Sequence, residues 1–377
     1  MNSNTIKHSL IILFSAINIV AYSQGCVAIR NFGSSSETIA GQNRSKGTIE
    51  LGLNYRYFKS FRHFRGSEEN SDRVANETEV INHSNNWEYT MTYWLNHSSS
   101  FVVGIPTQIN TRSSLYEHGR NERNLTSSRG MGDMRVGLQH WIKANEDRKW
   151  NQLLGVYIKL PTGNFKATDI FYNIGENGAP EVRPVDQSIQ LGDGGFGFIL
   201  NSQFVYSLSE NLFLTGGGSY LFNPREVNGT RTFRETLSSI LNNERIMSVP
   251  DQFSVNLSTN YLLNEHNSMY MGMRFEGVTV RDVLGGSSGF RRPGNVLSIE
   301  PGYSYMIDQI GFNLSVPIAV KRVRPQSVTD LETQKLTGNF RNGDAAFADY
   351  LINFTVRYTF KDKSKSSDLF KPSEFLQ

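Results

Sequence analysis

Residues 350–360, YLINFTVRYTF, decide the fold, because their side chains fall into two sets when every second residue is taken. The set that runs from Tyr350 to Phe360 is entirely aromatic or aliphatic, whereas the alternate set is mostly polar. Successive side chains of a β-strand point to opposite faces of a sheet, so the segment predicts a strand with one apolar and one polar face. Such a strand suits a soluble sandwich, in which a second sheet covers the apolar face, or an outer-membrane barrel, in which that face meets lipid.

The N-terminus indicates that the chain is exported. Residues 1–26, MNSNTIKHSLIILFSAINIVAYSQGC, contain a basic head, an apolar run from Leu10 to Val20 and then small residues. The run is too short to cross a bilayer and is typical of a cleavable secretory signal, for which we expect cleavage after Ser23. Cys26 is the only cysteine of the chain, which excludes an intramolecular disulfide. The sequence leaves open whether Cys26 carries a lipid or a free thiol.

The composition narrows the class of protein. The chain of 377 residues is 38% hydrophobic and has a formal net charge of +3. Beyond the N-terminal signal, no stretch approaches the roughly 18 continuous apolar residues of a transmembrane helix, so we exclude a helical membrane protein. A transmembrane barrel can be polar on average, because half of each strand faces its interior. The near-neutral charge gives no reason to expect nucleic acid as a partner.

The alternating pattern returns about twelve times, in segments of about nine to thirteen residues, the length that a tilted strand needs to cross a bilayer. Clear examples are TIELGLNYRY (48–57), WEYTMTYWL (87–95) and FSVNLSTNYLL (253–263). The connections between segments alternate strictly between short and long. The short ones are NHSSS, ANEDRK, SEN, NEHN and IDQ. A closed barrel with short periplasmic turns and long extracellular loops requires this alternation, and a Greek-key sandwich does not.

We therefore predict an all-β fold, a closed up-and-down antiparallel transmembrane β-barrel of about 12 strands. The expected organisation is a signal peptide (1–23), a short periplasmic segment (24–45), the barrel (46–360) and a polar periplasmic tail (361–377). The predicted location is the outer membrane of a Gram-negative bacterium, with outer-membrane lipid as a partner. The aromatic end of the last strand, Phe360, resembles an insertion signal, so we also expect barrel-assembly machinery as a partner during insertion.

Motifs in the middle of the chain carry a family resemblance. GMGDMRVGLQHWI (130–142), LLGVYIKLPTG (153–163) and the glycine-rich segment 191–222 resemble the outer-membrane porin-like family named after the meta pathway of phenol degradation. Members of that family carry a G-x-G-D strand start, a K-x-P-T-G strand end and a Gly-rich strand in this order. The resemblance implies a passive transporter of small organic compounds, without identifying the compound.

The polar faces of the predicted strands supply the candidate lining of a channel. Charges of both signs in a narrow barrel either pack into a plug of salt bridges or line a solute path. Twelve strands about 4.8 Å apart and tilted by about 40° close into a cylinder roughly 24 Å across, which leaves about 10 Å inside the side chains. We also expect Glu50 and Arg357 to meet across the seam between the first and last strands. The predicted lumen-facing residues are Glu50, Arg56, Glu88, Asp133, Arg135, Lys159, Arg274, Glu276, Glu300 and Arg357.

Other motifs do not fit known catalytic or binding sites. GDGGFG (192–197) begins a predicted strand instead of a phosphate-binding helix, and GGSSG (285–289) lies in a predicted loop. The histidine spacing matches no metal-binding motif, and we expect no catalytic residue, metal or cofactor. The predicted function is therefore an outer-membrane channel, not an enzyme, that passes a small organic solute passively through a narrow polar lumen.

Two alternatives to a channel stay open. The first is a barrel-embedded hydrolase acting on lipids, for which a Ser/His pair on the outer face would be the sign, with His140 as the histidine to examine. The second is a closed structural or surface-binding barrel, for which ion-paired packing across the whole lumen would be the sign.

Two loop segments have helical periodicity. VTDLETQKLTG predicts a short helix with Asp330 as its cap and Gly338 as its stop. RETLSSILNNERIM predicts an amphipathic helix over 235–247 that folds into the barrel mouth as a lid, because an exposed apolar face needs cover. A surface helix without a gating role is the alternative. The apolar residues of the proposed lid are Leu237, Ile240, Leu241 and Met247.

Overall fold

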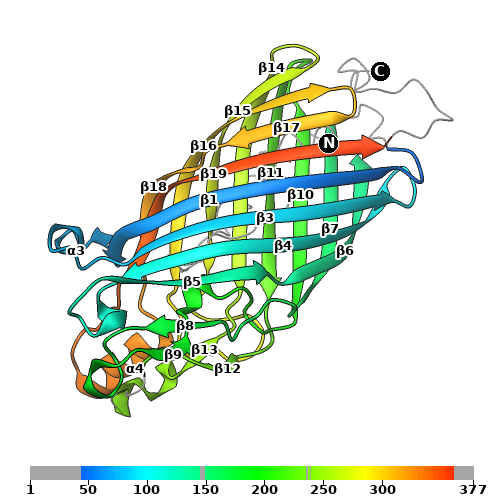
Figure 1. The fold of residues 1–377 in the computed structure, drawn as a ribbon. Helices are drawn as coiled ribbons and strands as arrows, with labels where there is room; N and C mark the ends of the chain where they lie inside the picture. The colour runs from blue at the N-terminus through cyan, green and yellow to red at the C-terminus, as the bar shows by residue number, and fades with distance from the viewer. Residues whose placement is uncertain (1–43, 145–148, 235–236, 238, 361–377) are drawn as a thin grey trace.

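The chain forms a closed antiparallel β-barrel, drawn in Figure 1. The computed structural model describes residues 44–144, 149–234, 237 and 239–360. Neighbours in the sequence are neighbours in the sheet, and the first strand, β1, pairs with both β3 and the last strand, β19. The β1–β19 ladder begins at Ile49 and Phe360 and closes the sheet on itself. The predicted closed barrel of twelve wall strands is confirmed.

Twelve wall positions make up the barrel, two of them built from two strand segments each. Their bounds are β1 (Ile49–Arg65), β3 (Ile81–Trp94), β4 (Ser99–Ser114), β5 (Asn124–Met131) with β6 (Met134–Ala144), β7 (Trp150–Leu160), β10 (Gly197–Ser207), β11 (Leu212–Phe222), β14 (Gln252–Leu262), β15 (Asn267–Val278), β16 (Gly294–Ile307), β17 (Ile310–Ser315) with β18 (Ile318–Val323), and β19 (Ala345–Phe360).

The break between β17 and β18 has a local cause. Pro317 stands between the two segments, and a proline has no N–H to donate to a neighbouring strand. The chain resumes its pairing with β16 after the proline, so the wall stays closed.

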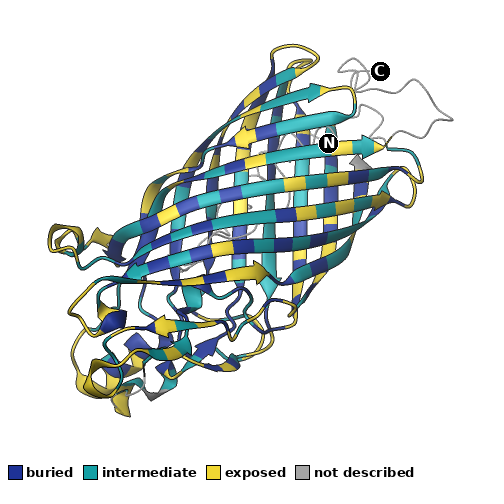
Figure 2. Cartoon of the chain, viewed as in Figure 1, coloured by how far each residue is buried: buried dark blue, intermediate teal, exposed yellow. Residues whose placement is uncertain are grey.

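The two faces of the wall differ as the alternation predicts (Figure 2). On β1, Leu51 is 44% exposed, whereas the neighbouring Glu50 is 5% exposed. On β19, the apolar Tyr350 and Phe354 are exposed and the polar Asn353 is buried. The apolar set of the opening segment therefore lies on the outside of the barrel, and the polar set lies inside.

Glycines on the wall make room for large rings. A Cβ atom on Gly302 would lie 2.0 Å from Cζ of Tyr270, and one on Gly137 would lie 2.4 Å from Cδ1 of Tyr157. Both tyrosines are buried on neighbouring strands. The glycine-rich composition of these strands thus allows aromatic rings to lie flat against the wall, where a side chain would exclude them.

Short turns gather at one end of the barrel, which we call the turn end, and β1 begins and β19 ends there (Figure 1). The predicted turns NHSSS, SEN, NEHN and IDQ fall between β3 and β4, β10 and β11, β14 and β15, and β16 and β17, so these four are confirmed. Most of the fifth predicted turn, ANEDRK, lies outside the described residues.

The long connections lie at the opposite end, which we call the loop end, and they are more ordered than expected. β1 continues to Arg65, beyond the alternating segment 48–57, and β4 pairs with the additional strand segment β5. These extensions carry no regular alternation of apolar and polar residues, although their backbones pair with neighbouring strands. The loop end also contains β2 (Glu68–Glu69), α3 (Asp72–Ala75), η1 (Tyr116–His118), β8 (Thr168–Phe171), η2 (Glu176–Gly178), β9 (Glu181–Pro184), η3 (Gln187–Ile189), β12 (Val227–Arg231), η4 (Ser239–Glu244), β13 (Ile246–Ser248) and α4 (Val328–Thr337).

The predicted lid helix over 235–247 is wrong. The structure has only the 3-10 helix η4 there, followed by β13, which pairs with β12, while residues 235, 236 and 238 lie outside the description. Met247 is fully buried in β13, Ile240 is 38% exposed, and Leu237 and Leu241 are half-buried. The helical spacing is misleading because Met247 packs as part of a two-stranded sheet, which buries it without a helix.

The second predicted helix is present as α4, with a different cap. Ser327 is the N-cap, its hydroxyl accepting a hydrogen bond from the Asp330 N–H. Asp330 occupies the third helical position and completes a capping box with the Ser327 backbone. Gly338 ends the helix in the left-handed conformation, as expected. Of the helices in the described ranges, none is long and apolar enough to cross a membrane.

Candidate functional site

Two cavities follow one another along the barrel. The lumen cavity, of about 190 Å³, lies among mid-strand residues that include Arg56, Glu88, Arg274 and Glu300. The second cavity, which we call the vestibule, has a volume of about 460 Å³ and lies at the loop end. Its lining includes Arg112, Arg234, Arg291, Arg292, Arg324 and Asp330. Together the two cavities define the region in which a solute inside the barrel would meet protein.

Six charged side chains near the middle of the strands form what we call the ionic belt: Arg56, Glu88, Arg135, Arg274, Glu276 and Glu300. Arg274 donates to both carboxylate oxygens of Glu300, at 2.8 and 2.5 Å. Its Nη1 lies 3.7 Å from Oε2 of Glu276. Arg135 is ion-paired with Glu88 on the facing side of the wall.

Arg56 connects the two halves of the ionic belt. It is on β1, its Nε donates to Oδ1 of Asn353 at 2.9 Å, and its charge interacts with both Glu276 and Glu88. Those two glutamates are on β15 and β3, strands that lie on different sides of β1 in the closed sheet. The belt therefore crosses the lumen, with equal numbers of positive and negative side chains, and narrows the passage.

Glu50 and Arg357 lie at the seam near the turn end. Nη1 of Arg357 is 4.0 Å from Oε2 of Glu50, in agreement with the expected contact across β1 and β19. A shorter contact was not foreseen: Nε of Arg44 donates to Oε1 of Glu50 at 2.6 Å. Arg44 precedes β1, where alternation gives no information on the direction of a side chain.

The remaining two lumen candidates, Asp133 and Lys159, form hydrogen bonds and an ion pair that join wall strands. Asp133 Oδ1 accepts from the Gly163 N–H at 2.9 Å, and its Oδ2 accepts from the Asp193 N–H at 3.0 Å. Lys159 is ion-paired with the Asp193 carboxylate. The three motifs that carry the family resemblance thus meet at one point, where they join β6, β7 and the segment before β10. This gives those residues a structural role in the wall.

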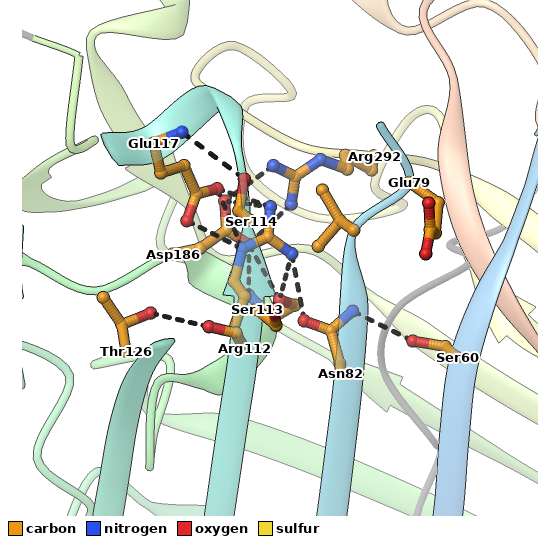
Figure 3. Close-up of polar contacts among 12 residues, drawn as sticks. Ser60, Glu79, Asn82, Arg112, Ser113, Ser114, Glu117, Thr126, Asp186 and Arg292 are labelled. Carbon is orange, nitrogen blue, oxygen red and sulfur yellow. Dashed lines mark hydrogen bonds and ion pairs between the residues drawn. The ribbon is translucent and has the colours of Figure 1, made fainter. Parts of the chain in front are cut away.

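A network of buried polar residues centres on Arg112 at the loop end (Figure 3). Arg112 donates to Oε1 of Glu117 at 2.6 Å and to Oδ1 of Asn82 at 3.0 Å. Its Nη2 also lies 3.6 Å from Asp186, which accepts two bonds from Arg292 at 2.7 and 2.6 Å. Burial would raise the pKa of the Asp186 carboxyl, but the two guanidinium groups outweigh it and hold that pKa well below its usual range.

Sequence reasoning missed this network because its members come from strand extensions and loops. Arg112 is on the outer part of β4, Asp186 follows β9, and Arg292 lies between β15 and β16. A signal was present in the adjacent Arg291 and Arg292, since a pair of arginines in a loop beside the barrel mouth needs carboxylate partners.

The histidine to examine, His140, does contact a serine. Its Nδ1 lies 2.9 Å from Oγ of Ser99, and the two residues are direct cross-strand partners on the outer face of β6 and β4. A serine hydrolase also needs a third group to orient the histidine and donors for the oxyanion. Within the described part of the chain no carboxylate contacts His140, so this pair gives the hydrolase alternative no further support.

Within residues 44–144, 149–234 and 239–360, no group of three or more His, Cys, Asp or Glu side chains is arranged to hold a metal ion.

Comparison with solved structures places the fold among outer-membrane barrels. The structure is similar to the crystal structure of an outer membrane channel from Pseudomonas putida F1, with a TM-score of 0.56 and 11% sequence identity, covering 88% of this chain and 100% of that one. A weaker similarity, with a TM-score of 0.41 and 9% identity, relates it to the Pseudomonas putida toluene transporter TodX over 89% of this chain and 99% of that one. In sequence, the chain matches no family model and no curated protein. At such low identity, the first similarity establishes the fold alone.

Proposed function

We propose that the protein is an outer-membrane channel that lets a small organic solute pass passively through the barrel. The observation that carries the proposal is a closed twelve-strand barrel with an apolar outer face and a polar inner face that lines two successive cavities. An apolar exterior over the full circumference suits a bilayer, and a polar interior suits a solvated path.

Several finer features belong to the same proposal. The similarity to a solved outer membrane channel supports transport, and the motif resemblance supports a relationship to the porin-like family named after the meta pathway of phenol degradation. We also propose that residues 1–23 are removed after export, that residues 24–45 and 361–377 lie in the periplasm, and that barrel-assembly machinery inserts the chain. In this orientation the turn end faces the periplasm and the loop end faces outward.

The geometry suggests how such a channel would select its solute. A molecule entering from outside first meets the vestibule and then the ionic belt, where Arg56 interacts with charges from both sides of the lumen. Side chains that cross a narrow lumen restrict passage to solutes that fit between them or displace them. The ionic belt is therefore the proposed size filter, and its neutrality favours no sign of charge.

The experiment is single-channel recording of the purified protein in a planar lipid bilayer. We expect discrete current steps for the wild type and larger steps for Arg56→Ala, because that substitution removes the side chain that joins the two halves of the belt. Arg129→Ala, at an exposed position of β5, is the matched control and should leave the steps unchanged.

Silence of the inserted wild-type barrel would contradict the proposal. If steps then appeared in Arg56→Ala alone, the belt would be a plug, and the closed structural barrel would be the better account. Equal conductance of the wild type and Arg56→Ala would show that the narrowest point lies elsewhere.

A further inference from the structure

The vestibule contains more arginines than carboxylates. Eight arginines and four carboxylates line it, among the residues that the structure describes. Two further carboxylates, Asp186 and Asp282, bind arginines of the lining, at 2.6 Å from Arg292 and 2.7 Å from Arg291. Eight guanidinium groups therefore meet six carboxylates, which leaves the region with an excess of two positive charges.

One of the two excess charges has a clear origin in the contacts. Arg324 and Arg341 share the single carboxylate of Asp330, each at 3.3 Å. Arg324 also interacts unfavourably with the charge of Arg292, and burial is the main cause that lowers its pKa. A bound anion would relieve this repulsion between the two arginines, whereas a further positive charge would increase it.

Two buried donors of the lining lack an acceptor. Arg291 and Arg324 are 2% and 3% exposed, and the Nε–H group of each has no hydrogen-bond acceptor among the described atoms. A buried guanidinium N–H without an acceptor is unfavourable, because water no longer satisfies it. Carboxylate oxygens are the partners that match such donors in both charge and geometry.

Three aromatic rings also line the vestibule. Phe233, Phe290 and Tyr116 contribute rings, and guanidinium groups lie over all three, for example Arg292 at 4.6 Å from the centroid of Phe290. A cavity of about 460 Å³ is the size of a site for one small organic molecule. Rings beside arginines suit a ligand with a flat apolar body and a charged oxyanion group.

We propose that the vestibule is a binding site for a small organic carboxylate, the first site that a solute meets on its way into the barrel. The inference rests on the proposed channel function and specifies its substrate class. The carboxylate binds among the guanidinium groups of Arg324, Arg291 and Arg292. The organic body contacts the aromatic rings of the lining. An inorganic oxyanion would satisfy the charges and leave the aromatic part of the lining without a partner.

The test is equilibrium dialysis of the purified, detergent-solubilised protein with labelled benzoate, with benzyl alcohol and inorganic phosphate as comparison probes. Benzyl alcohol has the same ring without the charge, and phosphate has the charge without the ring. We expect benzoate to bind more tightly than either. Arg324→Gln should weaken benzoate binding about tenfold, the loss of one charge-assisted contact, and the exposed Arg129→Gln should leave it unchanged.

A second variant keeps the test decisive if Arg324→Gln does not fold. Arg120 lines the vestibule with its guanidinium 5.2 Å from the centroid of the Tyr116 ring, and Arg120→Gln lowers the positive charge without unpairing Asp330. Arg120→Gln should weaken benzoate binding by a smaller factor than Arg324→Gln. Equal binding of benzoate and benzyl alcohol, tighter binding of phosphate, or an equal loss in Arg129→Gln would each overturn the proposal.

Channel recording separates this inference from the proposed function. Conducting barrels that do not bind benzoate would contradict the carboxylate site and leave the channel intact. Barrels that bind benzoate and do not conduct would contradict the channel and leave the site intact.

Discussion

The ionic belt and the vestibule contain the same residue types in different proportions. The belt has three arginines for three glutamates, whereas eight arginines around the vestibule meet six carboxylates. The belt lies in the middle of strands whose outer faces are apolar, and the vestibule lies among polar strand extensions and loops beyond them. An uncompensated charge is more costly inside a membrane-spanning barrel than near bulk water. The position of the belt deep in the membrane therefore requires its charges to balance, whereas the vestibule near bulk water can carry a net charge.

The largest expected effect comes from breaking the neutrality of the belt. Glu300→Gln removes the carboxylate that pairs closely with Arg274 and leaves Glu276, at the longer distance, as its carboxylate partner, so we expect the free energy of unfolding to fall by about 3–5 kcal/mol. Urea unfolding of the protein in lipid vesicles, followed by tryptophan fluorescence, measures this loss. Glu265→Gln, in an exposed turn between β14 and β15, is the control and should change it by less than about 0.5 kcal/mol.

A double variant sharpens this prediction. Arg274→Gln together with Glu300→Gln restores equal numbers of positive and negative side chains in the belt. Glu276, which loses Arg274 as a partner, still interacts with Arg56. We expect it to regain part of the lost stability. If the double variant is less stable than Glu300→Gln, hydrogen bonds matter more than charge balance in the belt.

An intermediate effect is expected at the Arg112 network beside the vestibule. Asp186→Asn removes the charge that Arg292 and Arg112 share, while Arg112 keeps Glu117, so we expect a loss of about 2 kcal/mol at pH 7. The pKa of Asp186 is lowered in the folded protein, so its ionised form stabilises the fold above the unfolded pKa of about 4, and this contribution falls as the pH is lowered below that value. The stability difference between wild type and Asp186→Asn should therefore shrink from pH 5 to pH 3. A difference that is constant over this range would mean that packing, not charge, is lost.

The smallest effect is expected at the outer rim. Arg62 binds Glu69 at 2.5 Å, but both side chains are about a third exposed, and Arg62 also binds Asp349 at 2.8 Å. Exposed pairs contribute little, so Glu69→Gln should cost about 0.5 kcal/mol, and the loss should decrease at high salt. A loss as large as that of Glu300→Gln would break the proposed link between depth and the strength of ion pairing.

Alternation of residues predicted the wall of the barrel and failed outside it. Tyr350 and Glu50 lie on the expected faces because a lipid-facing row must be apolar wherever the strand is in the membrane. Beyond the membrane the outer face of a strand meets water instead of lipid, so the pattern disappears, and β5, which pairs with β4, has no continuous apolar row. In the same region the helical spacing of apolar residues predicted a helix over 235–247, but Met247 packs in a small sheet.

The sequence by itself determined the fold class, the direction of the strands and the inward-facing charges, because each follows from local periodicity and from the lengths of connections. Only the tertiary structure decided which charges meet. Asp133, Gly163 and Asp193 are brought together from three separate motifs, and Arg112, Asp186 and Arg292 from a strand and two loops. Such contacts depend on the curvature of the closed wall and on how the loops pack over its mouth. Neither is encoded in the spacing of residues along one strand, since both arise from pairing between segments far apart in the chain.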